Sequence, residues 1–426
     1  MINFENINNT NNLIQQLFKN HGTFLEIHSL RSYAPGLLNR DDNGDAKTAY
    51  IGGTKRTIIS SQCKKSAIRQ ECIESRSSRT RRAPECIVSY ICETYDIDEK
   101  HKDDYLKIAY MLLSGKKDVN EKNSDNYMTP TIISIGNEDI KRIGNAIVKY
   151  FPIDKNIDFK KKKIAYSIED KETFNSLLKE LKNTVKASKV DYDICLFGRM
   201  STSEVVSSED SASWFNFGYS TNKNHNDSDF FVAQDVYSQA TALFTNLNTE
   251  PGAGHLNIRD INSDTFYDYA GFSLNAYVEN AMKGADFENK EEIKERLKSA
   301  VDYFCEAVEK TITVVPTAMQ HQMASFPDPV VYVTLKENAR NTTYDDAFES
   351  AVEDGNENSV MAESVKRLVE SINDSPFETG DVIKKYWVSK KNYSELANIE
   401  NVEKLTLQEL LADLRGYLYD EIGIEC

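Results

Sequence analysis

A switch from strand periodicity to helix periodicity within residues 23–75 restricts this chain to a fold that mixes both kinds of element. From Thr23 to Leu30, Phe24, Glu26 and His28 alternate with Leu25, Ile27 and Ser29, which is typical of a strand. Lys55 to Ile59 predicts a second short strand. Because Ser60 and Ser61 follow it and serine is a preferred N-cap, we predict a helix from there to about Ser75.

Helical and extended patterns continue to alternate along the chain, and we therefore expect an α+β fold. Further helices are predicted at Asp104–Ser114, Glu138–Tyr150, Lys171–Ala187 and Glu291–Lys310. Further strands are predicted at Tyr192–Gly198, Phe266–Tyr277 and Val330–Leu335. A β-α-β-β-α-β unit of the ferredoxin-like or RRM-like kind is compatible with this order, although the order does not require it.

Two segments lack the pattern of a packed core, and the C-terminal part differs from the rest in composition. Residues 1–22 are rich in Asn and Gln, and we expect a mobile lead-in with one short helical patch. Residues 198–264 combine many Ser and Asn residues with several aromatics, which indicates either disorder or a functional insertion. The chain beyond residue 336 is expected to be largely helical and acidic.

The composition favours a globular protein of the cytoplasm. Hydrophobic residues make up 40% of the chain and charged residues 28%, as in ordinary soluble proteins. No apolar run is long enough to cross a membrane, and the N-terminus lacks the basic and apolar regions of a secretory signal. The seven cysteines form no C-x-x-C pair, so we expect free thiols in a reducing compartment.

Charge is distributed unevenly along the chain. The formal net charge of −16 counts against nucleic-acid binding, because phosphate contacts need Lys and Arg. Residues 55–82, however, hold nine basic and two acidic residues, whereas residues 337–380 hold three basic and eleven acidic ones. Either one surface binds a polyanion while the rest stays acidic, or the basic segment is a solvated charged face.

The predicted helix after Ser60 has the features of a phosphate site. Gln62, Lys65 and Arg69 fall on one side of it, since residues three and four apart are neighbours on a helix. Ser60, Ser61 and the N–H groups of the first turn lie next to these cations, where an anion is favoured. Four basic residues upstream can add backbone contacts: Arg40, Lys47, Lys55 and Arg56. Such contacts position a nucleic acid without reading its sequence.

Residues 24–69 resemble the opening of the CasC family, the guide-RNA-binding backbone subunit of type I-E CRISPR Cascade complexes. The shared blocks are the strand with I-H-x-L character, L-N-R-D-D, G-G-x-x-R and I-S-S-Q-x-x-K-x-A-x-R. Later blocks match in the same order: Asp193–Met200, Ala253–Leu256, Phe266–Ala270 and Val315–Gln320. The resemblance extends in order from about residue 23 to residue 336.

The resemblance implies an RRM-like palm with a helical fingers insertion and a protruding thumb insertion. The palm would comprise residues 23–74, a strand at 190–200 and residues 264–336. The fingers would be residues 75–189 and the thumb residues 201–263. Residues 1–22 would be an extension, and residues 337–426 an acidic helical region that matches the family only loosely.

The resemblance also implies roles for particular residues. Seven side chains would contact the guide backbone: Arg40, Lys47, Lys55, Ser60, Gln62, Lys65 and Arg69. Met200 would lie beneath a kinked nucleotide, and Phe231, Val232 and Leu256 would form the thumb wedge in the guide–target duplex. The chain departs from the family at Met319, where a Lys is usual, and at Trp214–Tyr219, where a His-rich stretch is common.

The function so implied is a non-catalytic scaffold without metal or cofactor. Its partners would be the guide RNA, the target DNA strand, further copies of the chain, other Cascade subunits and, indirectly, a recruited nuclease. Asp41, Asp42 and Asp45 leave an alternative open, because type III backbone subunits cut target RNA with an Asp in a comparable loop and paired carboxylates can hold Mg²⁺. A weaker alternative is a single-copy processing enzyme.

Overall fold

The computed structural model describes eleven stretches of the chain. They are residue 4 and residues 7–18, 22–72, 77–97, 99–120, 127–153, 156–162, 165–234, 253–353, 359–375 and 380–423. Within them no helix is both long and apolar enough to cross a bilayer. They contain helices and a large central sheet, so the predicted α+β class is confirmed.

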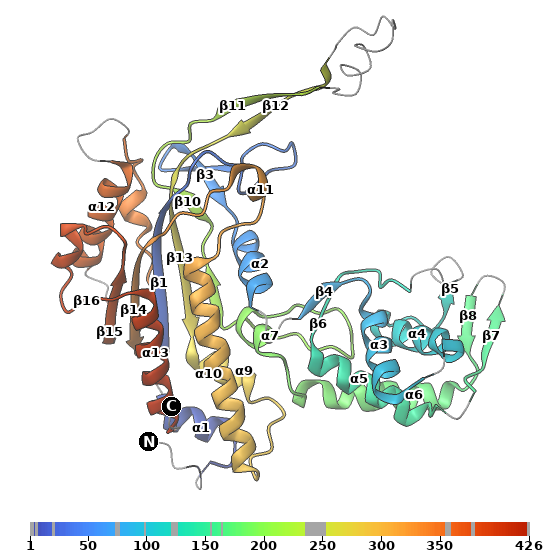
Figure 1. Ribbon diagram of the computed structural model, residues 1–426. Coiled ribbons are helices and arrows are strands. Elements are labelled where there is room, and N and C mark those ends of the chain that lie inside the picture. Colours follow the sequence, from blue (N-terminus) through green and yellow to red (C-terminus); the bar gives the residue numbers. More distant parts are fainter. Residues whose placement is uncertain are drawn as a thin grey trace, which may run out of the picture.

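The body of the molecule is built on one twisted sheet (Figure 1). Its described strands run in the order β16-β15-β14-β1-β13-β10-β3-β2, with β9 also paired to β13. The bounds are β1 Thr23–Ser32, β2 Thr48–Ile51, β3 Thr54–Ile59, β9 Ser213–Phe215, β10 Gly218–Ser220, β13 Thr265–Ser273, β14 Val330–Glu337, β15 Asp381–Val388 and β16 Glu403–Lys404. All neighbours are antiparallel except β15 and β16.

Helices cover both faces of this sheet, which is why β1 is buried along nearly all its length. Leu25 and Ile27 of β1 join a core with α1, α2, α9, α10 and α13, whereas Leu30 joins a second core with α12. These helices are α1 Thr10–Phe18, α2 Ser61–Glu71, α9 Leu274–Ala281, α10 Lys290–Thr313, α12 Val360–Asp374 and α13 Leu407–Ile422. Alternate side chains of a strand point to opposite faces, so both faces need apolar residues.

A small lobe projects from one side of the body (Figure 1). It comprises residues 77–190 with the loop 201–207, and it has a hydrophobic core of its own. Its helices are α3 Ala83–Tyr95, α4 Glu99–Ser114, α5 Asn137–Tyr150, α6 Lys171–Thr184 and η3 Val185–Ala187. Three predicted helices overlap α4, α5 and α6 with η3, whereas α3 is not among the predicted ranges. The sequence reading missed its short strands, β4 Ser78–Thr80, β5 Val119–Asn120, β6 Ile133–Ile135, β7 Phe159–Lys162 and β8 Ala165–Ile168.

A two-stranded hairpin extends beyond the sheet at the end of the body near β3 (Figure 1). It consists of β11 Asp227–Gln234 and β12 Ala253–Ile261, paired antiparallel. The segment predicted as one insertion, 201–263, is therefore divided. Residues 201–207 lie with the small lobe, β9 and β10 belong to the central sheet, and the hairpin β11–β12 extends beyond the sheet.

The buried strand predicted at Tyr192–Gly198 is wrong, because Tyr192–Phe197 forms the helix α7. Ile194, Cys195 and Leu196 are fully buried all the same. A short apolar run bounded by turn residues does not distinguish a buried strand from a buried helix. Gly198 ends the helix with φ 75°, a conformation that favours glycine, and a Cβ there would meet the Ser211 backbone at 2.8 Å.

The mobile lead-in predicted for residues 1–22 is also wrong for the part that the structure describes. Leu13 and Leu17 of α1 are buried in the main core, as is Ile7 before the helix. Lys290 donates a hydrogen bond to the carbonyl of Ile7. A few apolar residues at helical spacing suffice to anchor a segment that is polar elsewhere.

The C-terminal region contains the helices α12 and α13, and it also adds β15 to the sheet beside β14. Tyr386 and Trp387 of β15 contribute to opposite cores. Three short helical turns complete the described elements: η4 Asp345–Phe348, η5 Ser394–Asn398 and α11 Gln320–Met323. The acidic chain beyond residue 336 therefore also contributes a strand to the central sheet.

Candidate nucleic-acid interface

Helix α2 begins where its sequence predicts. The Ser60 hydroxyl accepts a hydrogen bond from the N–H of Cys63 at 3.3 Å, which is the geometry of an N-cap. The N–H of Ser60 donates to the side-chain oxygen of Asn39 at 2.9 Å. Ser60 is buried, whereas Gln62 in the first turn of the helix is exposed. The cap therefore ties the start of α2 to the loop that follows β1.

That loop brings two of the predicted cations to the start of α2. Arg40 is next to Asn39 in sequence and is exposed. Its backbone forms an isolated antiparallel β-bridge with Ala46. The N–H of Lys47 donates to the carbonyl of Asn39 at 2.9 Å. Lys55 on β3 is exposed as well. Arg40 therefore follows Asn39 in sequence and Lys47 is hydrogen-bonded to it, and Asn39 is the residue that binds the N-cap Ser60.

Two adjacent lysines of α2 have different surroundings. Lys64 forms an ion pair with Asp268 at 2.8 Å and donates to Asn216, so its charge is neutralised within the body. The Lys65 ammonium lies 5.2 Å from the centre of the Phe215 ring. In the described part of the chain it has no carboxylate partner. Partial burial, and secondly the charge of Arg69, lower the pKa of Lys65. A phosphate next to Lys65 would oppose both effects, because its negative charge favours the protonated ammonium.

Arg56, predicted as one of four upstream cations that add contacts to a nucleic-acid backbone, is fully buried. Its guanidinium donates to the carbonyls of Ser220 and Thr221, each at 2.7 Å, and to that of Phe348 at 3.0 Å. Burial lowers its pKa. This corrects the prediction, because the side chain joins β3 to β10 and to η4 and has no exposed surface to offer a phosphate.

Arg69 is also engaged inside the protein. It pairs with Asp193 at 2.7 Å, donates to the Ser77 hydroxyl and is 13% exposed. Its guanidinium lies 5.8 Å from the Phe197 ring. Met200, by contrast, is 90% exposed, which is unusual for an apolar side chain of this size. Met200 is therefore accessible to a ligand, whereas Arg69 is held between Asp193 and Ser77.

The three residues predicted as a thumb wedge do not share one face. In the hairpin register Val232 lies opposite Leu256, and Phe231 opposite Asn257. Neighbouring residues of a strand point to opposite faces, so Phe231 faces away from Val232. Its ring is instead 4.9 Å from the Arg259 guanidinium. The side chain of Leu256 lies outside the described residues.

By register Leu256 lies on the face of Val232, and so do Phe230 and Ile258, which are paired with each other. Both are more than half exposed, and Val232 is 41% exposed. Strict alternation along a predicted strand would have identified them. The hairpin therefore presents an apolar face, Phe230, Val232 and Ile258. The predicted wedge includes Val232 of this face but neither Phe230 nor Ile258.

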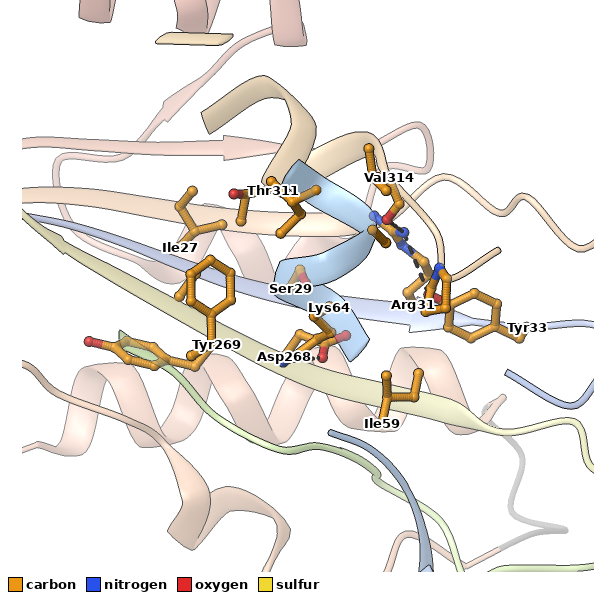
Figure 2. A pocket seen from close by; sticks show the side chains of 15 residues that line it. Ile27, Ser29, Arg31, Tyr33, Ile59, Lys64, Asp268, Tyr269, Thr311 and Val314 are labelled. Atoms are coloured by element: carbon orange, nitrogen blue, oxygen red, sulfur yellow. Dashed lines mark hydrogen bonds and ion pairs between the residues drawn. The ribbon is translucent and has the colours of Figure 1, made fainter. Parts of the chain in front are cut away.

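A cavity lies beneath α2, between the helix, the sheet and the end of α10 (Figure 2). Arg31 projects from β1 at one end and donates to the carbonyls of Val314, at 2.9 Å, and Ile312. It thereby satisfies carbonyls at the C-terminus of α10. Lys64 and Asp268 are paired on the wall, and burial raises the pKa of Tyr33. These groups hold helices against the sheet.

The acidic loop residues have a structural role in part. One carboxylate oxygen of Asp41 accepts from the N–H groups of Asn43 and Asp45, at 2.9 and 3.0 Å, which closes a tight turn. Asp42 is exposed. Among the described residues no group of three His, Cys, Asp or Glu side chains is placed to hold a metal ion. The six described cysteines form no disulfide.

Comparison with known proteins identifies relatives. A family described as CT1975-like protein matches residues 25–413. A solved chain titled "CRISPR RNA-guided surveillance complex, pre-nicking" aligns with a TM-score of 0.65 and 23% identity, covering 92% of this chain and 100% of the other. Another, titled "CRISPR RNA-guided surveillance complex", aligns with a TM-score of 0.49 and 18% identity, over 92% and 99%. The comparison with curated sequences gives no match. At 23% identity the likeness concerns the fold.

Proposed function

Because this chain belongs to the family of CT1975-like proteins, we propose that it is an RNA-binding subunit of a Cascade-type CRISPR surveillance complex. More narrowly, it is the non-catalytic CasC-type backbone of a type I-E complex. Copies line up along the guide RNA and present the spacer for pairing with target DNA. The fold shared with a chain of an RNA-guided surveillance complex supports this proposal.

The order of elements supports an RRM-like palm. Four elements of the sheet, β1, β10, β13 and β14, are interrupted in the chain by α2 and α10, which gives β1-α2-β10-β13-α10-β14. Their spatial order is β14-β1-β13-β10, and neighbours are antiparallel. Both helices pack on the same face. This is the β-α-β-β-α-β plan of ferredoxin-like units. The small lobe then corresponds to the fingers and the β11–β12 hairpin to the thumb.

The observation that carries the proposal is the group of cations at the start of α2. Arg40 and Lys47 belong to the loop that is hydrogen-bonded to the N-cap of α2, and Lys65 lies near the start of that helix, on a chain whose net charge is −16. A helix N-terminus with nearby cations favours phosphate oxygens. Contacts of this kind hold a nucleic-acid backbone in register and leave its bases to specify the target by pairing.

In this proposal the exposed Met200 lies beneath a kinked nucleotide, and the apolar face of the hairpin touches the guide–target duplex. An apolar side chain that unstacks a base step costs a few kcal/mol, which new contacts offset. The remaining partners are further copies of the chain, other subunits and an indirectly recruited nuclease. The protein works without metal, cofactor or chemistry of its own, in the cytoplasm.

Co-expression with a CRISPR guide RNA tests the proposal. We expect the purified full chain to carry RNA, visible as a raised ratio of absorbance at 260 nm to that at 280 nm, and to form assemblies with several copies per guide by native mass spectrometry. The variant Arg40→Ala/Lys47→Ala/Lys65→Ala should purify with much less RNA. Protein that is free of RNA, and that does not bind a single-stranded RNA afterwards, would refute the proposal.

A cleavage assay separates the scaffold from the metal-dependent alternative. With complementary RNA and Mg²⁺ the loaded complex should leave the target intact. Cuts at regular spacing that disappear in Asp41→Ala or Asp42→Ala would favour a type III-like subunit. The hydrogen bonds from Asn43 and Asp45 to Asp41 support the scaffold, because they occupy one of its carboxylate oxygens within the turn.

A further inference from the structure

The block Asp193–Met200 connects the body to the small lobe through its two charged ends. Its middle, α7, is buried in the main core, where Ile194, Cys195 and Leu196 are fully enclosed. Asp193 and Arg199 lie at either side of this apolar middle, and both side chains are shielded from solvent.

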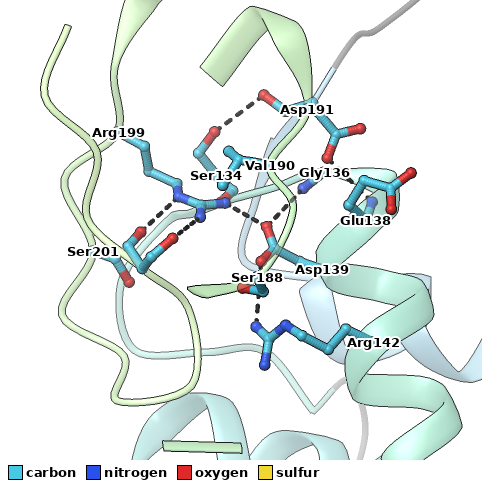
Figure 3. A network of polar contacts seen from close by, with 12 residues as sticks. Ser134, Gly136, Glu138, Asp139, Arg142, Ser188, Val190, Asp191, Arg199 and Ser201 are labelled. Carbon is cyan, nitrogen blue, oxygen red and sulfur yellow. Dashed lines mark hydrogen bonds and ion pairs between the residues drawn. The ribbon is translucent and has the colours of Figure 1, made fainter. Parts of the chain in front are cut away.

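Arg199 contacts the start of α5 in the small lobe (Figure 3). Its guanidinium forms an ion pair with Asp139 of α5 and donates to the carbonyl of Ser134 at 3.3 Å. Beside it, the Asp191 carboxylate accepts from the N–H groups of Asn137 and Glu138, at 3.0 and 3.1 Å. The lobe is therefore attached at the N-terminus of α5, where a carboxylate is electrostatically favoured.

Asp193 makes a second attachment, and this one includes the basic helix. One of its carboxylate oxygens accepts from the Ser77 N–H at 3.0 Å, from the Ser77 hydroxyl at 2.6 Å and from Arg69 at 2.7 Å. Ser77 immediately precedes β4, and its hydroxyl lies 3.2 Å from that of Ser134 in β6. Arg69 is thus shared between α2 and the small lobe.

We propose that Asp193 is a positioning residue that links nucleic-acid binding at α2 to the attachment of the small lobe, acting through Arg69. This inference rests on the proposed function. The contacts to Asp193 and Ser77 use one terminal nitrogen of the Arg69 guanidinium, and a guanidinium carries further donors in a rigid fork. A phosphate bound by those donors restrains the side chain and stabilises the Asp193–Ser77 junction. By reciprocity, a firmly attached lobe strengthens RNA binding.

Hydrogen exchange on the full chain tests this link. Amide exchange in β4 and β6 is measured with and without a saturating single-stranded RNA, whose affinity is followed separately by fluorescence anisotropy. In the wild-type protein we expect RNA to slow exchange of these strands by about fivefold or more, the lower end of coupling between linked sites. In Asp193→Asn, which keeps the size and removes the charge, RNA should still bind but exchange should no longer respond.

Asp139→Asn is the matched control, because it breaks the Arg199 attachment without touching Arg69. It should speed exchange in the lobe yet keep the response to RNA. If Asp193→Asn fails to fold, Arg69→Lys replaces it, since it keeps the charge and loses the fork. Bound RNA with unchanged exchange in the wild type, or a full response in Asp193→Asn or Arg69→Lys, would overturn the link alone. Absence of RNA binding by the wild type would overturn the proposed function with it.

Discussion

Glu26 and Lys336 form an ion pair across the central sheet, with carboxylate and ammonium 2.8 Å apart and both side chains excluded from solvent. They lie on the adjacent strands β1 and β14. The Tyr269 hydroxyl and the Thr342 N–H also donate to the Glu26 carboxylate, at 3.0 and 2.6 Å. Buried charges are tolerated when they are paired and hydrogen-bonded, so this pair constrains which residues of the two strands can face each other.

Removing one partner of this pair should be costly. In Lys336→Met the buried carboxylate loses its counter-ion, and we expect the free energy of unfolding to fall by about 3–5 kcal/mol. Glu26→Gln/Lys336→Met should recover most of that loss, because no uncompensated charge is left. Urea unfolding followed by circular dichroism measures both. A loss below about 1 kcal/mol in the single variant would show that water or another group compensates the charge.

His28 should make the protein sensitive to acid. Burial, and secondly the charge of Lys336, place the pKa of His28 well below its usual value. The unfolded chain therefore takes up a proton near pH 6.5 while the folded protein does not. Stability is complete above that pH and is lost as the pH falls below it. The thermal midpoint should drop between pH 6.5 and 5, and less steeply in His28→Asn. An equal slope in both proteins would assign the effect to other groups.

Lys65→Ala should weaken the binding of single-stranded RNA and reduce its dependence on salt. The slope of log K against log salt should fall by about 0.7 for the lost phosphate contact. Lys391→Ala is the matched control, because Lys391 is exposed beyond the other edge of the sheet and should leave the slope unchanged. Titrations at several salt concentrations give the slope. A slope equal to that of the wild type would make the basic face of α2 a solvated surface.

Arg56→Met should lower the stability of the protein and leave the salt dependence of RNA binding unchanged. The protein loses a buried guanidinium that donates to three carbonyls within 3.0 Å, and these acceptors are left unsatisfied. We expect a loss of about 2–5 kcal/mol in the free energy of unfolding. At a temperature where the variant is folded, its RNA salt slope should match the wild type. A reduced slope of log K against log salt would show that Arg56 contacts the RNA phosphates after all.

Phe230→Ser/Ile258→Ser tests the apolar face of the hairpin. Both residues are exposed, so the free energy of unfolding should change by about 0.5 kcal/mol or less. Binding of short RNA should be retained, whereas complexes with a guide paired to target DNA should be weaker. Phe231→Ser, on the other face, is the control for the same readout. Loss of RNA binding itself in the double variant would show that the hairpin holds the guide directly.

The elements around the predicted phosphate site could be read from local sequence. The strands β1 and β3 and the cap at Ser60 lie where alternation and serine placed them, because these patterns act over a few residues. Asn39 carried no such signal. It joins the loop to the helix through contacts that depend on how the chain is folded around them.

What the sequence by itself determined was the kind of element at most positions and the local excess of positive charge before residue 82. Only the tertiary structure decided which cations face solvent. Arg56 and Lys55 are neighbours in a strand, and the pleat sends one inward to carbonyls from β10 and η4 and the other outward. Arg69 pairs with Asp193, 124 positions away, so its partner depends on long-range packing that no local pattern records.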